Sequence, residues 1–283
     1  MEFHQLDYVT RCADLSVVDQ SIFTRIKYIY RGEEPLNEFK FGVWEDSSIG
    51  PSSCLSSGYN LDLNSSYHYL TRNERCLDFF EASKLIAPPD DHSYITSLVF
   101  LNNEASSSLV HYNGGQGAPQ TGTTDPLLPR HFHNLLSAKW LDDSPLVQGG
   151  NGYPQPDSTQ SPTSFSFPDL PTDPNGWSMY TTNDIIALDH RRITNLVDIE
   201  ILQPGDEGVV DFADHIFYDR QSPNFEIFDR WPSEITALKS AYTDMLTGAF
   251  NCQTSSAIDL AENELSIYPN PVSYTHLTLP TKA

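Results

Sequence analysis

The residues best suited to chemistry lie in one loop, "LDDSPLVQGGNGYPQPD" at residues 141–157, and shortly after it. Six side chains there could contact a ligand: Asp142, Asp143, Asn151, Tyr153, Asp157 and Trp177. The carboxylates and the amide offer the oxygen ligands that Ca²⁺ prefers, and the two aromatic rings offer stacking faces for a sugar. The alternative interpretation is an ordered loop that caps a helix end, although loops on rigid scaffolds often carry function. No cofactor is therefore expected, unless Ca²⁺ binds this loop.

The chain has two pairs of adjacent carboxylates, Asp90/Asp91 and Asp142/Asp143, which is a reason to consider glycosidase chemistry. These enzymes place two carboxyl groups across one glycosidic bond. Neighbours in sequence do not supply that separation by themselves, and acidic pairs are common in a chain with 38 Asp and Glu. The pairs are therefore better explained as solvated surface.

Other polar motifs favour structural roles. His131 and His133 are two residues apart, so on a helix they point to opposite sides and cannot hold one ion. The run "DHRR" at 189–192 suits an ion pair beside a strand. The chain contains no G-x-S-x-G, H-E-x-x-H or P-loop motif. No catalytic residue is identified, and the sequence favours a protein that is not an enzyme.

Alternating apolar residues predict many short strands. The segments with this pattern are 3–10, 21–30, 38–46, 77–86, 94–101, 163–167, 193–202 and 208–218. Short turn-forming links join 21–30 to 38–46 and 193–202 to 208–218, so each pair is predicted to be an antiparallel hairpin. In the hairpin 21–45 one buried face is expected to hold Ile22, Ile26, Phe39 and Phe41.

Two segments have the apolar period of a helix, residues 129–140 and 233–250. Pro129 suits a helix start, and Ser233 is the expected N-cap of the second helix. Many strands with only two helices predict a mainly β fold, an antiparallel β-sandwich rather than alternating βαβ units.

The overall charge excludes one class of partner. With 16 Lys and Arg, the 283-residue chain has a formal net charge of −22, which repels phosphate backbones, so nucleic-acid binding is not expected. No run of 18 apolar residues predicts a transmembrane segment. Four cysteines, Cys12, Cys54, Cys76 and Cys252, permit disulfides, but their spacing does not choose among three pairings, and buried free thiols remain the alternative.

The C-terminal stretch "LSIYPNP", residues 265–271, resembles the start of the type A sorting domain of the type IX secretion system, found on exported Bacteroidota proteins. The matching residues are Leu265, Ile267, Tyr268, Pro269, Asn270 and Pro271. The resemblance implies passage through the periplasm to the cell surface or medium, with the secretion machinery as a partner. Residues 273–283 lack the family's later pattern and are interpreted as an artefactual tail. The N-terminus has no leader pattern, so we expect it to be incomplete.

Segments between residues 20 and 250, such as "IKYIYRGEEPLNEFKFGVWED", are similar to an uncharacterised region of long type IX-secreted proteins. That region has more acidic residues after "WED", which argues against Ca²⁺ at Glu45 and Asp46 here. The expected organisation is a sandwich domain at 1–252, a linker at 253–264, and the sorting-domain start at 265–272 before the tail. The sequence predicts a non-catalytic secreted or surface module for adhesion, glycan binding or scaffolding; the alternative is part of a secreted glycosidase or peptidase.

Overall fold

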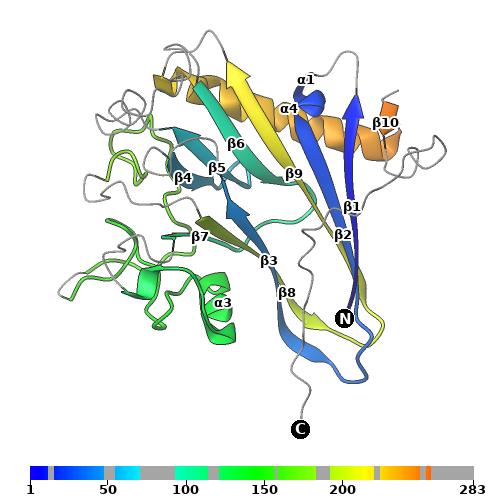
Figure 1. Cartoon of the computed structure of the whole chain (residues 1–283), viewed down its shortest axis with the longest axis horizontal. Helices are drawn as coiled ribbons and strands as arrows, with labels where there is room; N and C mark the ends of the chain where they lie inside the picture. Colours follow the sequence, from blue (N-terminus) through cyan, green and yellow to red (C-terminus); the bar gives the residue numbers. More distant parts are fainter. Residues whose placement is uncertain are drawn as a thin grey trace, which may run out of the picture.

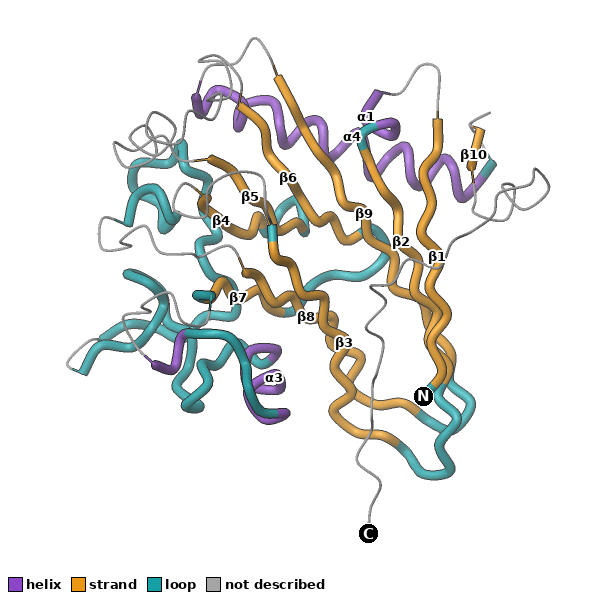
Figure 2. The backbone as a smooth tube through the Cα atoms, in the orientation of Figure 1, coloured by secondary structure: helices purple, strands orange, loops and turns teal. Residues whose placement is uncertain are grey.

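A computed structural model describes residues 1–11, 16–47, 55–70, 93–113, 121–156, 159–182, 192–219, 224–248 and 253–255. The fold is mainly β, with two antiparallel sheets, as predicted (Figures 1 and 2). The strands are β1 (Glu2–Arg11), β2 (Ser21–Ile29), β3 (Leu36–Asp46), β4 (Leu55–Asn60), β5 (Ser65–Leu70), β6 (Ser93–Phe100), β7 (Ser107–His111), β8 (Arg192–Leu202), β9 (Glu207–Asp219) and β10 (Gln253–Ser255). The α-helices are α1 (Ser16–Asp19), α3 (Pro129–Leu136) and α4 (Ile227–Thr247). Two 3₁₀ turns, η2 (Thr121–Thr123) and η3 (Asn224–Glu226), precede α3 and α4.

The larger sheet has seven strands in the order β10-β1-β2-β9-β6-β5-β4. Alternation along β9 assigns its two faces, because successive side chains of a strand point to opposite sides. Ala213 and Phe217 pack beneath α4, while Val210 and Phe212 pack toward the smaller sheet. The smaller sheet has the order β3-β8-β7, and its apolar side chains share a core with this second face.

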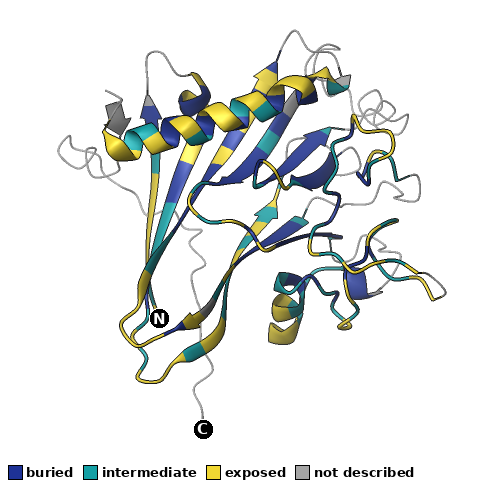
Figure 3. Cartoon of the chain, turned by 180° about the vertical axis from the view of Figure 1, so that it is seen from behind, coloured by how far each residue is buried: buried dark blue, intermediate teal, exposed yellow. Residues whose placement is uncertain are grey.

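Helix α4 lies across the first face of the larger sheet (Figures 1 and 3). Its buried stripe includes Trp231, Ile235 and Leu238, and the Trp231 Nε1 donates a hydrogen bond to Ser97 Oγ at 2.9 Å. Beside them Arg25 forms a two-pronged ion pair with Asp211 of β9. These contacts fix the helix to the sheet, since buried polar groups need their partners.

The predicted start of this helix at Ser233 is wrong, because α4 begins at Ile227 and contains Pro232. Proline lacks the backbone N–H donor and usually breaks a helix. Here Ile227 and Phe228 are buried against the sheet, and their burial offsets the lost hydrogen bond. The helix ends at Thr247, three residues before the predicted end, at Gly248 with a left-handed φ of 70°.

Both predicted hairpins are wrong. β2 pairs with β1 and β9 in the larger sheet, whereas β3 pairs with β8 in the smaller one. The two connections cross between the sheets side by side, linked by hydrogen bonds from Tyr30 N to Asp206 O and from Gly205 N to Tyr30 O. Ile22 is consequently 51% exposed, and Phe41 is only half-buried.

A long irregular segment, residues 121–182 with α3 inside it, packs around a third apolar cluster. α3 ends at Leu136 instead of the predicted residue 140, because Ala138 adopts a left-handed φ of 52° and the chain turns away. This turn directs Trp140 into the cluster, where it is fully buried and its Nε1 donates to Gly152 O at 2.9 Å.

Other predicted strands are shorter than expected or lie outside the described residues. Residues 163–167 form only an isolated bridge from Phe165 to Ser108, since the segment belongs to the irregular layer. The predicted strand 77–86 lies outside the described residues. The sequence interpretation missed β4, β5 and β7, whose Ser and His residues conceal the apolar alternation. β10 occupies the start of the predicted linker and pairs with β1.

Candidate ligand-binding cleft

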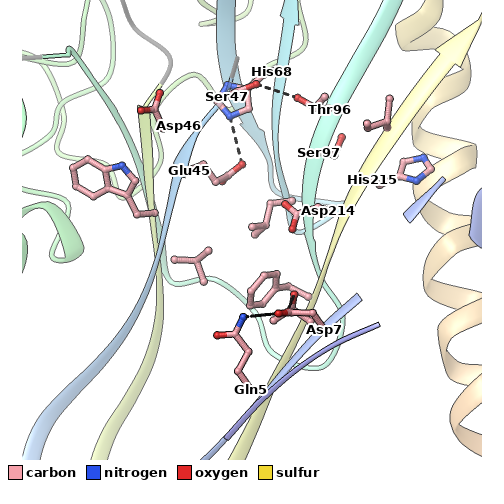
Figure 4. Close-up of a pocket in the computed structure, with 16 residues that line it drawn as sticks. Gln5, Asp7, Glu45, Asp46, Ser47, His68, Thr96, Ser97, Asp214 and His215 are labelled. Atoms are coloured by element: carbon pink, nitrogen blue, oxygen red, sulfur yellow. Dashed lines mark hydrogen bonds and ion pairs between the residues drawn. The ribbon is translucent and has the colours of Figure 1, made fainter. Parts of the chain in front are cut away.

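A cleft of about 550 Å³ separates β3 of the smaller sheet from β1, β2, β9, β6 and β5 of the larger one (Figure 4). The two sheets seal against each other where their facing side chains are apolar, around Tyr28, Phe39 and Val210. Toward the other end the facing residues become polar, and the space between the sheets opens. We call this space, with its lining residues, the acidic cleft.

Four carboxylates line the acidic cleft: Asp7 from β1, Glu45 and Asp46 from β3, and Asp214 from β9. Asp46 forms an ion pair with Arg192, whereas the other three have no lysine or arginine partner among the described residues. The registers of β1, β2 and β9 place Asp7 and Asp214 on one face of the larger sheet, and Glu45 faces them from the smaller sheet. None of the residues that line the cleft is a lysine or an arginine. Walls of low dielectric focus the field of such charges, so the cleft favours a cationic ligand.

Glu45 is tightly held, and its side chain is only 11% exposed. Its Oε1 accepts hydrogen bonds from Ser66 Oγ and from Asn195 Nδ2. Its Oε2 lies 3.4 Å from Nε2 of His68, and the other ring nitrogen, Nδ1, is 2.8 Å from Ser57 Oγ. Packing on both sides therefore fixes the position of this carboxylate.

Asp214 has the opposite environment. No described residue donates a hydrogen bond to its carboxylate or forms an ion pair with it. The surrounding protein removes water from the group and, with the negative charges of Glu45 and Asp7, raises the pKa of Asp214 to about 6. Asp7 has partners, since it accepts hydrogen bonds from Thr24 Oγ1 at 2.7 Å and from Gln5 Nε2.

The rest of the lining combines polar side chains, among them Gln5, Thr96 and Ser97, with apolar ones. Val43, Leu98, Phe212 and Ile216 contribute aliphatic or buried aromatic surface. Trp44 lines the rim, but its indole packs against the ring of His111, with centroids 4.7 Å apart. Trp44 remains 38% exposed at this rim.

The string of Ser57, His68 and Glu45 does not have the geometry of a nucleophilic triad. Ser57 is 1% exposed, so no substrate can reach its hydroxyl group. Its oxygen lies near Nδ1 and the carboxylate near Nε2, the reverse of the hydrolase arrangement. Among the described residues no group of three or more His, Cys, Asp or Glu could hold a metal ion.

In the loop at residues 141–157, which the sequence pattern suggested as the ligand site, polar side chains form hydrogen bonds within the loop. The Asp142 carboxylate accepts hydrogen bonds from the Tyr153 hydroxyl and from Ser144 N, and the first of these bonds helps lower the pKa of Asp142. Asn151 Oδ1 accepts from Tyr153 N at 3.2 Å. Trp177 is 7% exposed and donates from Nε1 to Gly150 O. These groups bind one another, and ligand binding at the loop stays a prediction.

Further predicted positions can also be placed. Asp143 is exposed and pairs with Lys139 at 3.0 Å, while Asp157 lies outside the described residues. Arg192 of the "DHRR" run forms ion pairs with Asp46 and Asp125, as the structural interpretation predicted. His131 and His133 lie on α3.

Other predicted positions lie outside the described residues. They are the pair Asp90/Asp91, the four cysteines and the sorting-signal residues Leu265, Ile267, Tyr268, Pro269, Asn270 and Pro271. Within the described part of the chain, no helix combines the length and apolar character needed to cross a membrane.

The sequence interpretation missed the acidic cleft. Asp214 interrupts the otherwise apolar strand "VVDFADHIF", and a charged residue between Ala213 and a histidine was the available signal. The pattern could not show which residues of other strands would face it. The sequence matches no protein-family model, and no curated protein matches it.

Proposed function

We propose that this chain is a non-catalytic binding module of a protein exported by the type IX secretion system, and that its ligand site is the acidic cleft. The export part of the proposal depends on the resemblance of residues 265–271 to the sorting-domain start. It implies a secreted or cell-surface location and the secretion machinery as a partner. Of the three roles considered, adhesion suits the cleft best.

One observation carries the binding proposal: four carboxylates line a cleft of about 550 Å³, none of its lining residues is a lysine or an arginine, and among the described residues only Asp46 of the four pairs with an arginine. Like charges held close together repel one another unless a ligand supplies the opposite charge. Asp214 has no partner among the described residues that would stabilise its charge, so its position favours a role in binding. The excess of carboxylates over cationic side chains in the lining favours a ligand with a positive charge, and a protein partner supplies one more readily than a neutral glycan does.

The test is a binding screen of the full chain against arrays of extracellular glycans and of peptides. Wild type is compared with Asp214→Asn and with Asp229→Asn, which makes the same charge change on exposed α4, across the larger sheet from the cleft. The proposal expects ligands that Asp229→Asn retains and Asp214→Asn loses. Ligands that both variants bind equally would place binding elsewhere and overturn the proposal.

A second function, glycoside hydrolysis, is favoured by the pairing of Asp214 with Glu45. Loss of hydration raises the pKa of Asp214 to about 6, whereas Glu45 accepts hydrogen bonds from Ser66 Oγ and Asn195 Nδ2. Two carboxyls in unlike environments suit a general acid and its partner base. Turnover of fluorogenic glycosides by wild type, abolished in both Asp214→Asn and Glu45→Gln, would establish this function and overturn the binding role.

A further inference from the structure

No described element covers part of one face of the larger sheet beside the acidic cleft, and that surface is apolar. Val9, Ile22 and Ile216 are 49%, 51% and 54% exposed, and Tyr218 is 37% exposed. Val9 follows Asp7 by two residues, Ile22 is the direct partner of Asp214, and Ile216 follows Asp214 by two residues. Strand alternation therefore places these side chains on the face that holds the carboxylates. We call Val9, Ile22, Ile216 and Tyr218 the apolar strip.

Contiguous exposed apolar residues on a folded surface mark interaction sites more often than isolated ones do. The smaller sheet covers this face of the larger sheet only where their shared core lies, and α4 covers the other face (Figures 1 and 3). A ligand that enters the acidic cleft would lie directly beside the strip. Its chemistry is therefore limited by two adjacent surfaces, one acidic and one apolar.

We infer that the partner is a basic peptide segment of another protein, whose lysine or arginine side chain enters the acidic cleft while neighbouring apolar side chains rest on the apolar strip. This inference rests on the proposed binding function and names its ligand class. The charged head would lie between Asp214 and Glu45. The aliphatic stem would contact Val43, Leu98 and Phe212, since long basic side chains bury their stems on apolar surface.

A second observation points to a ligand at the same place. His68 is 2% exposed, and within the described part of the chain its Nε2 has no hydrogen-bond partner; its contact with Glu45 Oε2 at 3.4 Å is an ion pair only when the histidine is protonated. A buried polar atom without a partner is uncommon in a folded protein. An ammonium or guanidinium group has several N–H donors, so it can donate hydrogen bonds to Asp214 and to the Nε2 of His68 at the same time.

The side chains that line the cleft also favour a peptide over a glycan as the ligand. Sugars gain much of their affinity by stacking on exposed aromatic faces, and the indole of Trp44 packs instead against His111. Phe212 is 8% exposed, so it offers an edge of the cleft floor and no open platform. Aliphatic walls with carboxylates at the end suit a lysine side chain better than a hydroxyl-rich ring.

The experiment uses the full chain and two nonapeptide libraries with randomised flanks. One library has a central lysine, and the other has norleucine, which keeps the stem and lacks the ammonium group. We expect wild type to retain the lysine library at least about tenfold better, with apolar residues selected in its flanks. Asp214→Asn should lose that preference, and Ile22→Ser should lose the selection of apolar flanks while keeping the preference for lysine.

The control separates a specific site from the attraction that a charge of −22 exerts on any cation. A non-specific attraction would leave Asp214→Asn and Asp229→Asn equally able to bind, and that result overturns the inference. Equal retention of the lysine and norleucine libraries overturns it as well. A neutral glycan bound by wild type and lost in Asp214→Asn would refute the peptide while supporting the binding function, and turnover of a substrate would refute both.

Discussion

Asp214 is expected to destabilise the folded protein at neutral pH, because its ionised form has no cationic partner within the described structure. Folding raises the pKa of its carboxyl from the ordinary value of 3.8 to about 6. The folded chain therefore binds more protons than the unfolded chain between these two values, and its stability falls as the pH rises through them. Below about pH 4 the group is neutral in both states and the cost vanishes.

The size of the effect follows from the pKa. A difference of about two in pKa corresponds to about 3 kcal/mol of unfolding free energy. The side chain opens to the cleft, so solvent screening reduces this upper value to about 1 kcal/mol. Asp214→Asn removes the charge and keeps the shape, so we expect it to stabilise the protein by that amount above pH 6.5 and to have no effect near pH 4.

Urea unfolding of wild type, Asp214→Asn and Asp229→Asn at intervals from pH 4 to pH 7.5 measures the effect. The control variant makes the same charge change at Asp229, which is exposed in the first turn of α4. Because this change also removes a favourable interaction with the helix N-terminus, the two variants are compared by how their stability changes between pH 4 and pH 6. The expected signature is a stabilisation specific to Asp214→Asn that appears between pH 4 and pH 6. A variant that is less stable than wild type at pH 7 would show that Asp214 has a favourable partner, and the reasoning would be wrong.

Three further substitutions test the fold by urea unfolding at neutral pH. Phe41→Ala should lower the free energy of unfolding by about 2 kcal/mol. The loss is smaller than for a fully buried phenylalanine, because Phe41 is half-buried between the sheets. An unchanged free energy of unfolding would mean that the sheets do not share this core. Trp231→Phe should cost about 2 kcal/mol, since it leaves a cavity and removes the hydrogen bond to Ser97 Oγ; a loss below about 0.5 kcal/mol would question the docking of α4. Gly152→Ala should cost at least about 1 kcal/mol, because φ is +82° and the new Cβ would lie 2.6 Å from Leu146 Cδ1; a stabilised variant would contradict this backbone.

The sequence predicted the elements of this fold better than their pairing. Alternating apolar residues identified β2, β3, β8 and β9 within about two residues of their ends. The short links at 30–35 and 203–206 predicted hairpins, yet each link crosses from one sheet to the other. Strand alternation shows which side chains share a face, but it contains no information about which distant strand completes a ladder.

The candidate site could not be predicted from the sequence, for a related reason. Asp7, Glu45 and Asp214 come from β1, β3 and β9, and they become neighbours only because β2 joins β1 to β9 and the smaller sheet packs against the larger one. The loop around Asp142 attracted attention because its polar residues are close in sequence. In the structure Asp142 and Asn151 bind Tyr153 and fix the loop, which is the usual fate of clustered polar groups in turns.

If the acidic cleft binds a cationic group at Asp214, the pKa of the Asp214 carboxyl must change on binding, so this pKa is the most direct test. The measurement is a ¹³C NMR titration of the Asp214 carboxyl, assigned with Asp214→Asn, in the free protein and with a peptide selected from the lysine library. We expect a pKa of about 6 in the free protein, and a lower pKa in the complex because an adjacent ammonium group favours the ionised form. A pKa that is near 4 in the free protein, or that the bound peptide leaves unchanged, would show that Asp214 does not bind the cationic group.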